Sequence, residues 1–217
     1  MNKSIRWKTA QFFEYFWWKN YLHKKDTQNY LIKKKEYWTN LFSKIEDYVT
    51  LSPKTKILDA GCGPSGIYMI FTEQQVTAVD PILNRYQELK VFSKDFYPNV
   101  EFIESPLELY IQKKKFDLIF CMNVINHVSQ IKIAVQNLCA SLNYGGKMIV
   151  TVDAHNYNFL KEIFQKIPGD ILHPHQLNKE EYINLFENGG LSLLSSIELK
   201  QEFIFNHLLF VFEKKSN

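Results

Sequence analysis

The chain has 217 residues, of which 46% are hydrophobic and 23% charged, and its formal net charge is +3. This length suits one domain with a full core and a modest appendage, and the composition excludes a chain that is disordered throughout. The lysine runs at 33–35 and 113–115 lie among acidic residues, so we interpret them as solvated surface rather than as a nucleic-acid-binding face.

The cysteines and the longest apolar run give information about the compartment. Cys62, Cys121 and Cys139 have neither paired nor metal-type spacing. Since there is also no signal-peptide pattern, we expect reduced thiols and a cytoplasmic location. The apolar stretch 203–212 is shorter than the roughly 18 residues that a membrane-spanning helix needs, so we expect a core strand there and no stable membrane insertion.

The first fifty residues are aromatic and basic, with almost no glycine or proline. Apolar residues recur at helical spacing from Tyr30 to Val49, and Phe12 to Tyr21 show a similar pattern, which predicts two helices. We expect residues 1–50 to form a helical lid over a larger domain that comprises residues 51–217.

After residue 51, short apolar runs alternate with helical stretches, which is typical of a parallel sheet covered on both faces. We predict strands near residues 56–60, 76–80, 100–103, 116–121 and 147–153. Predicted helices occupy residues 65–74, 82–96, 106–113, 129–142 and 179–188. Residues 154–177 are expected to form an insertion over the active site, with a short helix at 157–167.

The end of the chain predicts a reversed strand. The apolar runs 191–199 and 203–212 are joined by only three residues, which is enough for a hairpin but too short for a parallel crossover. A nucleotide-binding dehydrogenase domain of the common type is entirely parallel, so this ending argues against that class.

The most informative segment is Lys56–Gly66, where an apolar run ends in Asp59 and opens into a loop with the spacing G-x-G-x-x-G. Glycines allow the backbone to approach a ligand closely because no Cβ stands in the way. A second apolar run ends in Asp80, about twenty residues beyond the first glycine, which is the spacing of a carboxylate that binds ribose hydroxyls.

Four motifs together carry a family resemblance: LDAGCGPSG at 58–66, Asp80, FDLIFCMNVINHV at 116–128 and LNYGGKMIV at 142–150. In this combination the chain resembles the class I S-adenosylmethionine-dependent methyltransferases, over roughly residues 57–212. The resemblance implies an α/β fold with a Rossmann-like, doubly wound seven-stranded sheet, mostly parallel with one antiparallel C-terminal strand.

The resemblance also implies a site for S-adenosylmethionine at the carboxyl ends of the strands. Its predicted residues are Asp59, Gly61, Cys62, Gly63, Asp80, Pro81, Ser105, Leu107 and Asn123. Asp80 is expected to hold the ribose diol, since a carboxylate offers two acceptors to two adjacent donors. The family's usual acidic residue after the third strand is missing, so Ser105 or the Leu107 amide is expected to meet the adenine instead. Asp59 as a turn cap, Asp80 as a helix cap and Asn123 as a turn residue remain open alternatives.

For catalysis, His127 is the candidate general base, because an imidazole titrates near neutrality and lies here beside the expected cofactor. Residues 121–128 are similar to the corresponding stretch of ubiquinone-pathway O-methyltransferases, but Asn123 and Asn126 replace acidic residues, which speaks against a metal-assisted mechanism. A purely structural role for His127 is the alternative.

Five residues are predicted to bind the methyl acceptor: Tyr15, Trp18, Tyr157, His173 and His175. The two histidines alternate in an extended segment and so point the same way, although we identify no further ligands and expect no metal site. Simple loop structure for the histidines and helix packing for the aromatic residues are the alternatives. Shallow membrane contact by the aromatic and basic N-terminal helix is a further one.

The leading functional hypothesis is methyl transfer from S-adenosylmethionine to a hydroxyl of a small or lipid-like molecule, by a monomer or homodimer. No N/D-P-P-Y/F motif follows the fourth predicted strand, and no nucleic-acid-binding module is evident. The first alternative is a catalytically silent member that binds the cofactor and supports a partner protein. The second is a nicotinamide-dependent oxidoreductase.

Overall fold

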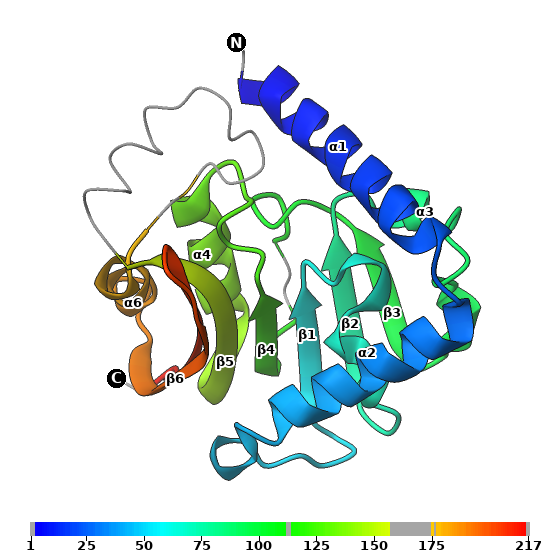
Figure 1. Ribbon diagram of the computed structural model, residues 1–217. Helices are drawn as coiled ribbons and strands as arrows, with labels where there is room; N and C mark the ends of the chain where they lie inside the picture. Colours follow the sequence, from blue (N-terminus) through cyan, green and yellow to red (C-terminus); the bar gives the residue numbers. More distant parts are fainter. Residues whose placement is uncertain (1–2, 112–113, 157–174, 176, 216–217) are drawn as a thin grey trace.

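The computed structural model describes residues 3–111, 114–156, 175 and 177–215, and its centre is one seven-stranded sheet (Figure 1). The strands are β1 (Lys56–Ala60), β2 (Gln75–Asp80), β3 (Val100–Glu104), β4 (Phe116–Met122), β5 (Leu142–His155), β6 (Ser192–Gln201) and β7 (Phe205–Glu213). Their order is β3-β2-β1-β4-β5-β7-β6. The pairs from β3 to β5 are parallel, whereas β7 runs antiparallel to both β5 and β6. The predicted fold class, with one reversed strand near the C-terminus, is confirmed.

Helices lie on both faces of this sheet. They are α1 (Lys3–His23), α2 (Thr27–Phe42), α3 (Leu83–Tyr86), α4 (Ile131–Ser141) and α6 (Lys179–Glu187), with short 3₁₀ turns η1 (Glu46–Tyr48), η2 (Gly63–Ser65), η3 (Ile67–Ile70) and η4 (Lys94–Phe96). Asp26 caps α2 by accepting a hydrogen bond from Asn29 N, and Asn178 begins α6 with a reciprocal capping box to Glu181. None of the described helices is both long enough and apolar enough to cross a membrane.

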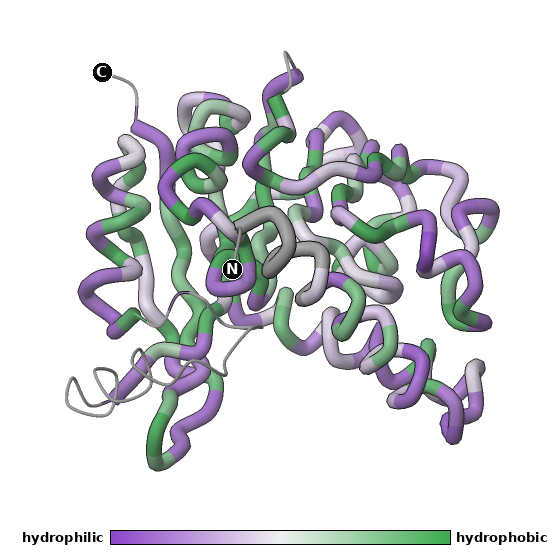
Figure 2. Tube along the Cα trace, turned by 90° about the horizontal axis from the view of Figure 1, so that it is seen from above, coloured by the Kyte–Doolittle hydropathy of each residue, from purple (hydrophilic) through white to green (hydrophobic). Residues whose placement is uncertain are grey.

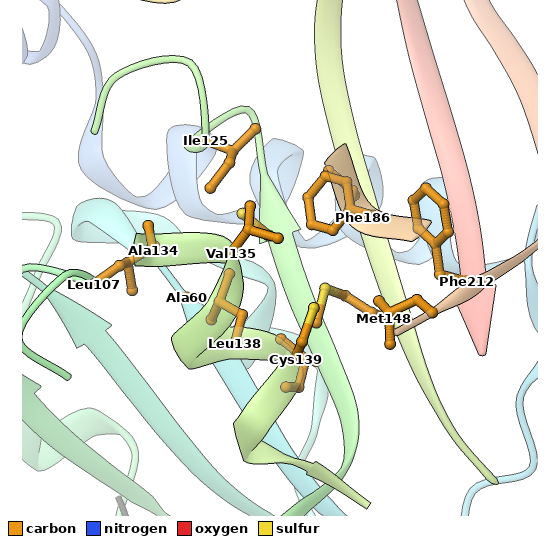
Figure 3. Close-up of a cluster of buried hydrophobic side chains, with 14 of the residues drawn as sticks. Ala60, Leu107, Ile125, Ala134, Val135, Leu138, Cys139, Met148, Phe186 and Phe212 are labelled. Atoms are coloured by element: carbon orange, nitrogen blue, oxygen red, sulfur yellow. The ribbon is translucent and has the colours of Figure 1, made fainter. Parts of the chain in front are cut away.

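Two hydrophobic clusters hold the layers together. One joins α4 and α6 to the sheet, with Leu138, Met148 and Phe186 fully buried (Figure 3). The other joins α2 to the other face through Trp38 and Leu41. In the view from above, hydrophilic residues lie mainly on the outer turns, and hydrophobic residues lie inside (Figure 2). The carboxyl ends of β1, β2 and β4 are thereby held in fixed positions along one edge.

The helix predicted at 65–74 is wrong, since this stretch contains only the 3₁₀ turns η2 and η3. The apolar pattern there reflects burial of the Tyr68 ring rather than one face of a helix. The end of the stretch is held as a loop, because Asn99 Nδ2 donates to the carbonyls of Phe71 at 2.6 Å and Gln74 at 3.0 Å.

The helices predicted at 82–96 and 106–113 are also wrong. The first is reduced to the single turn α3 and the 3₁₀ turn η4. In the second, residues 106–110 form turns, and Asn137 Nδ2 donates to the carbonyls of Leu107 and Glu108, both at 2.9 Å. These carbonyls would otherwise accept the hydrogen bonds of a helix. The helix predicted at 157–167 lies outside the described residues.

Candidate functional site

The glycine loop after β1 makes a close backbone crossing that requires glycine. Gly61 has φ +75° and Gly63 has φ +56°. The amides of Gly61 and Cys62 both donate to Val79 O, at 2.7 and 3.1 Å, which ties the loop to β2. A Cβ on Gly61 would stand 2.3 Å from a methyl carbon of Val124, so the loop after β4 packs directly against this glycine.

Asp80 ends β2 beside this loop and is 4% exposed. Its Oδ2 accepts a hydrogen bond from Gly63 N and its Oδ1 accepts one from Ile82 N, both at 3.0 Å. Burial, and secondly the charge of Glu14, raise its pKa to about 8. A carboxylate has about four lone-pair sites, so each oxygen can still accept a hydroxyl. The helix-cap alternative for Asp80 and the ribose-binding prediction are therefore compatible.

Asp59 lies beneath the loop rather than on its open side. Its Oδ2 accepts a hydrogen bond from Tyr68 N at 3.0 Å, and a Cβ on Gly66 would stand 2.4 Å from the same oxygen. Burial raises the pKa of Asp59 to about 7 and that of the neighbouring Cys62 thiol well above its usual value. Asp59 thus shapes the loop, and its predicted contact with a cofactor remains a prediction.

Helix α1 covers this part of the edge (Figure 1). Tyr86 Oη donates to Glu14 at 3.0 Å, and Tyr15 donates its hydroxyl to Glu88. The Trp18 ring lies 3.8 Å from the position that a Cβ on Gly63 would take. The predicted acceptor-binding residues Tyr15 and Trp18 therefore lie against the cofactor half of the site, with the Tyr15 hydroxyl directed at Glu88.

Glu14 is a site residue that sequence reasoning missed. Burial raises the pKa of Glu14, and its charge is the second cause of the raised pKa of Asp80. The available signal was that Glu14 is the one acidic residue in the otherwise aromatic and basic α1 sequence. The half-buried Glu14 carboxyl therefore lies close enough to the buried Asp80 to affect its pKa, where the sequence predicted one carboxylate.

The loop after β4 brings an unusual residue to the same edge. Asn123 has φ +57°, in the left-handed region that asparagine tolerates better than most residues. Its backbone N–H donates to Thr151 O at 2.9 Å. Its Oδ1 is buried and has no hydrogen-bond partner among the residues that the structure describes. An unpaired buried acceptor is costly, so this oxygen is well suited to a donor from a ligand.

The other predicted cofactor residues lie nearby. Ser105 N donates to Asp80 O at 3.2 Å, which connects β3 to the Asp80 end of β2, while its hydroxyl donates to Pro106 O at 3.1 Å. Pro81 is half-buried directly after Asp80, and Leu107 is buried. Contacts between these side chains and adenine remain predictions.

His127 lies in the turn between β4 and α4, where its amide donates to Val124 O at 2.8 Å and its side chain is half-buried. His175 is also half-buried, close to the capped start of α6. Tyr157 and His173 lie outside the described residues. Within the described ranges, no group of three or more His, Cys, Asp or Glu side chains is arranged to hold a metal ion.

This donor set fits the parts of S-adenosylmethionine. The Asp80 carboxylate suits a ribose diol, the glycine backbone allows close approach, and the unpaired Asn123 oxygen suits a cationic amino-acid end. Trp18 and Glu14 lie against the same part of the edge, so α1 bounds the site on one side.

Comparison with known proteins identifies relatives. The family model described as "Methyltransferase domain" matches residues 30–203. The Ubiquinone biosynthesis O-methyltransferase of Rickettsia akari is 28% identical over 100 residues, which cover 45% of this chain and 40% of that protein. The matched region thus spans less than half of that relative's length.

Solved structures share the fold at low sequence identity. YcgJ of Bacillus subtilis has a TM-score of 0.67 at 15% identity, covering 84% of this chain and 100% of that one. The 1,6-didemethyltoxoflavin-N1-methyltransferase of Burkholderia thailandensis, solved with 1,6-didemethyltoxoflavin and S-adenosylhomocysteine, has a TM-score of 0.66 at 13% identity, covering 98% of this chain and 89% of that one. At these identities the likeness concerns the fold alone.

Proposed function

The chain belongs to the methyltransferase domain family of class I S-adenosylmethionine-dependent methyltransferases, and from this membership we propose that it methylates a hydroxyl of a small molecule. The observation that carries the proposal is the buried Asp80 carboxylate, held by Gly63 N and Ile82 N at the end of β2. It stands where a ribose diol is recognised in sheets of this kind. The glycine loop beside it allows the backbone to approach the rest of the cofactor closely.

When bound, S-adenosylmethionine supplies a methyl group that is already activated by its sulfonium. The chain then has to hold, align and shield the reactants. Asp80 fixes the ribose, the backbone of Gly61 to Gly63 underlies the amino-acid end, and Asn123 Oδ1 accepts a hydrogen bond from its ammonium. Helix α1 excludes water from above, since Trp18 already contacts this loop.

A hydroxyl acceptor must lose its proton, and we assign that step to His127. It follows β4 on the loop that packs against Gly61, and an imidazole nitrogen that is neutral near pH 7 can take the proton as the oxygen attacks. His127 would act as a base only in its neutral form, so the rate should fall as pH decreases through its pKa.

The class of acceptor rests on the relatives. Curated proteins that match about half of this chain are named ubiquinone biosynthesis O-methyltransferases, which favours oxygen and a small or lipid-like acceptor. The residues proposed to contact it, besides Tyr15 and Trp18, are Tyr157, His173 and His175. A cytoplasmic location, a monomeric or homodimeric state and the lid role of residues 1–50 remain predictions.

The test combines binding and turnover. Calorimetry should show binding of S-adenosylhomocysteine and none of NAD, which separates this proposal from an oxidoreductase. Methyl-labelled S-adenosylmethionine incubated with metabolite extracts should label a small molecule, and His127→Ala should lower that rate at least tenfold. Binding without labelling in any extract would favour the catalytically silent alternative. An unchanged rate for His127→Ala at every pH would remove it from the mechanism.

A further inference from the structure

The outward side of α1 carries a row of exposed aromatic rings. Five residues of this row, here called the aromatic ridge, are 40% to 54% exposed: Phe12, Phe13, Phe16, Trp17 and Tyr21. The pairs Phe12–Phe16, Phe13–Trp17 and Trp17–Tyr21 are each four residues apart, so the rings are neighbours on the outward half of the helix. The rings contact each other, with centroids 4.5 Å apart for Phe12 and Phe16 and 4.9 Å apart for the stacked Trp17 and Tyr21.

Tyr21, at the end of the ridge, meets the Tyr30 ring of α2 edge-on with centroids 6.3 Å apart. The ring contacts of Phe12, Phe13, Phe16 and Trp17 stay within α1. The opposite side of the helix seats α1 on the domain, through Tyr15, which is buried, and through Trp18 and Leu22, which pack against the same hydrophobic cluster. Single exposed apolar residues are ordinary on a surface, but a continuous row of five large rings indicates an interaction surface. Seen in Figure 1, α1 crosses the carboxyl edge of the sheet, where the proposed site lies.

The charges around the ridge are basic. Lys19, Lys24 and Lys25 are exposed, and the Lys25 ammonium lies 3.9 Å from the centroid of the Tyr21 ring. Glu14, the one acidic residue in α1, is directed into the body of the protein, where it accepts a hydrogen bond from Tyr86. Pairing with a second copy of this helix would bring like charges together, whereas an anionic surface complements them.

We propose that α1 lies on the surface of an anionic lipid bilayer, with the aromatic ridge among the headgroups and the lysines against lipid phosphates. Phe rings supply apolar area, and Trp and Tyr favour the boundary between headgroups and acyl chains. Each basic side chain near such a surface adds attraction. The helix remains seated on the domain, so the membrane contact is peripheral, and the entrance of the proposed site opens beside the bilayer.

Co-sedimentation of the full chain with vesicles tests this proposal. Vesicles of phosphatidylglycerol and phosphatidylcholine should bind the protein at least tenfold more tightly than vesicles of phosphatidylcholine alone. The double substitution Phe13→Ser with Trp17→Ser should reduce binding to the anionic vesicles at least tenfold. Lys19→Glu with Lys24→Glu should reduce it by about fivefold or more per lysine, which corresponds to about 1 kcal/mol each.

The matched control is Tyr144→Ser. Tyr144 is an aromatic residue that is 65% exposed at the opposite edge of the sheet, so this variant should bind vesicles like the unchanged protein. Equal binding by the Phe13→Ser, Trp17→Ser variant would overturn the proposal. The proposal would also be overturned if the unchanged protein did not bind vesicles and light scattering showed it to be a dimer that becomes a monomer in the same double variant.

The membrane proposal and the methyltransferase proposal can fail separately. The ridge faces away from Asp80, so its variants should keep the circular dichroism spectrum and the affinity for S-adenosylhomocysteine of the unchanged protein. Absence of S-adenosylhomocysteine binding in all variants, together with ridge-dependent vesicle binding, would count against the proposed function alone.

Discussion

The two edges of the sheet differ in whether their charged and polar side chains have partners within the protein. At the amino edge, Asp117 accepts hydrogen bonds from Lys56 N at 2.9 Å and from Asn143 Nδ2 at 2.7 Å. Lys147 pairs with Glu213 at 2.6 Å. At the carboxyl edge, the charge of the half-buried Glu14 raises the pKa of the buried Asp80. Asn123 Oδ1 is buried there without a hydrogen-bond partner among the described residues.

The difference separates stabilising groups from groups that await a ligand. At the amino edge, Asp117, Lys147 and Glu213 each have a partner, which is what a structural role requires. The carboxyl edge holds carboxylates whose pKa values are raised, an arrangement that destabilises the unliganded protein and is typical of binding sites. Substituting matched residues at the two edges tests this contrast.

The largest effect is expected for Asp80→Ala, measured as affinity for S-adenosylhomocysteine by calorimetry. Above the raised pKa of about 8, the substitution removes two hydrogen bonds from hydroxyls to a charged acceptor, each worth about 1.5–3 kcal/mol. Affinity measured at pH 9 should therefore fall about a thousandfold. Asp117→Ala is the control at the other edge and should leave affinity unchanged, although it costs stability. A loss below tenfold for Asp80→Ala would show that position 80 does not hold the ribose.

The second prediction compares two glycines with the same backbone conformation, Gly61 and Gly145, each with φ +75°. A Cβ on Gly145 meets nothing within 4 Å, whereas one on Gly61 collides with Val124. Gly145→Ala should therefore cost only the conformational term of about 1–2 kcal/mol. Gly61→Ala should cost about 1–3 kcal/mol more, measured by urea denaturation. Equal costs would mean that the close crossing at Gly61 relaxes freely.

The third prediction concerns pH. Burial raises the pKa of Glu14, and burial together with the charge of Glu14 raises the pKa of Asp80 to about 8. Between pH 4 and 8 the folded protein therefore holds protons on these groups that the unfolded chain has released, so stability falls as pH rises. Glu14→Gln keeps an acceptor for Tyr86 but removes one charge. It should raise the melting temperature at pH 8 by a few degrees and make the fall in stability with rising pH less steep.

Glu213→Gln is the control for that experiment, and it should lower the melting temperature at pH 8 instead of raising it. Lys147 lowers the pKa of Glu213, so this carboxylate stabilises the fold above its unfolded pKa and the stabilisation is lost as pH falls. A lower melting temperature for Glu14→Gln at pH 8 would contradict the repulsion at the carboxyl edge.

Much of the fold could be predicted because its signals are local in the sequence. Strand ends carrying Asp59 and Asp80, the glycine loop and the C-terminal hairpin depend on short spacings, and the sheet has the expected strands. The helices expected after residues 65, 82 and 106 were wrong, because an apolar pattern does not distinguish the face of a long helix from rings buried by single turns. Tyr68 in η3 and Tyr86 at the end of α3 are such rings.

The arrangement of the site was harder to predict for a different reason. Glu14 meets Asp80 only because α1 docks across the edge, a contact between residues far apart in the chain. Likewise, the engagement of Asp59 by Tyr68 N depends on the 3₁₀ turn η3 rather than on a helix. Motif spacing identified which residues gather at the edge. It did not identify which of their atoms already form hydrogen bonds within the protein.

The smallest effect is expected at the amino edge, for the pair Lys147–Glu213. Its side chains are 20% and 26% exposed, so solvent and salt screen the attraction, and a double-mutant cycle with Lys147→Met and Glu213→Gln should give about 0.5 kcal/mol of coupling. The coupling should weaken in 1 M salt, where the screening length is about 3 Å. The effect of Glu14 on Asp80 should be screened less by the same salt, because Asp80 is 4% exposed and Glu14 is half-buried. Equal salt sensitivity of the two pairs would show that the carboxyl edge is open to solvent before any ligand binds.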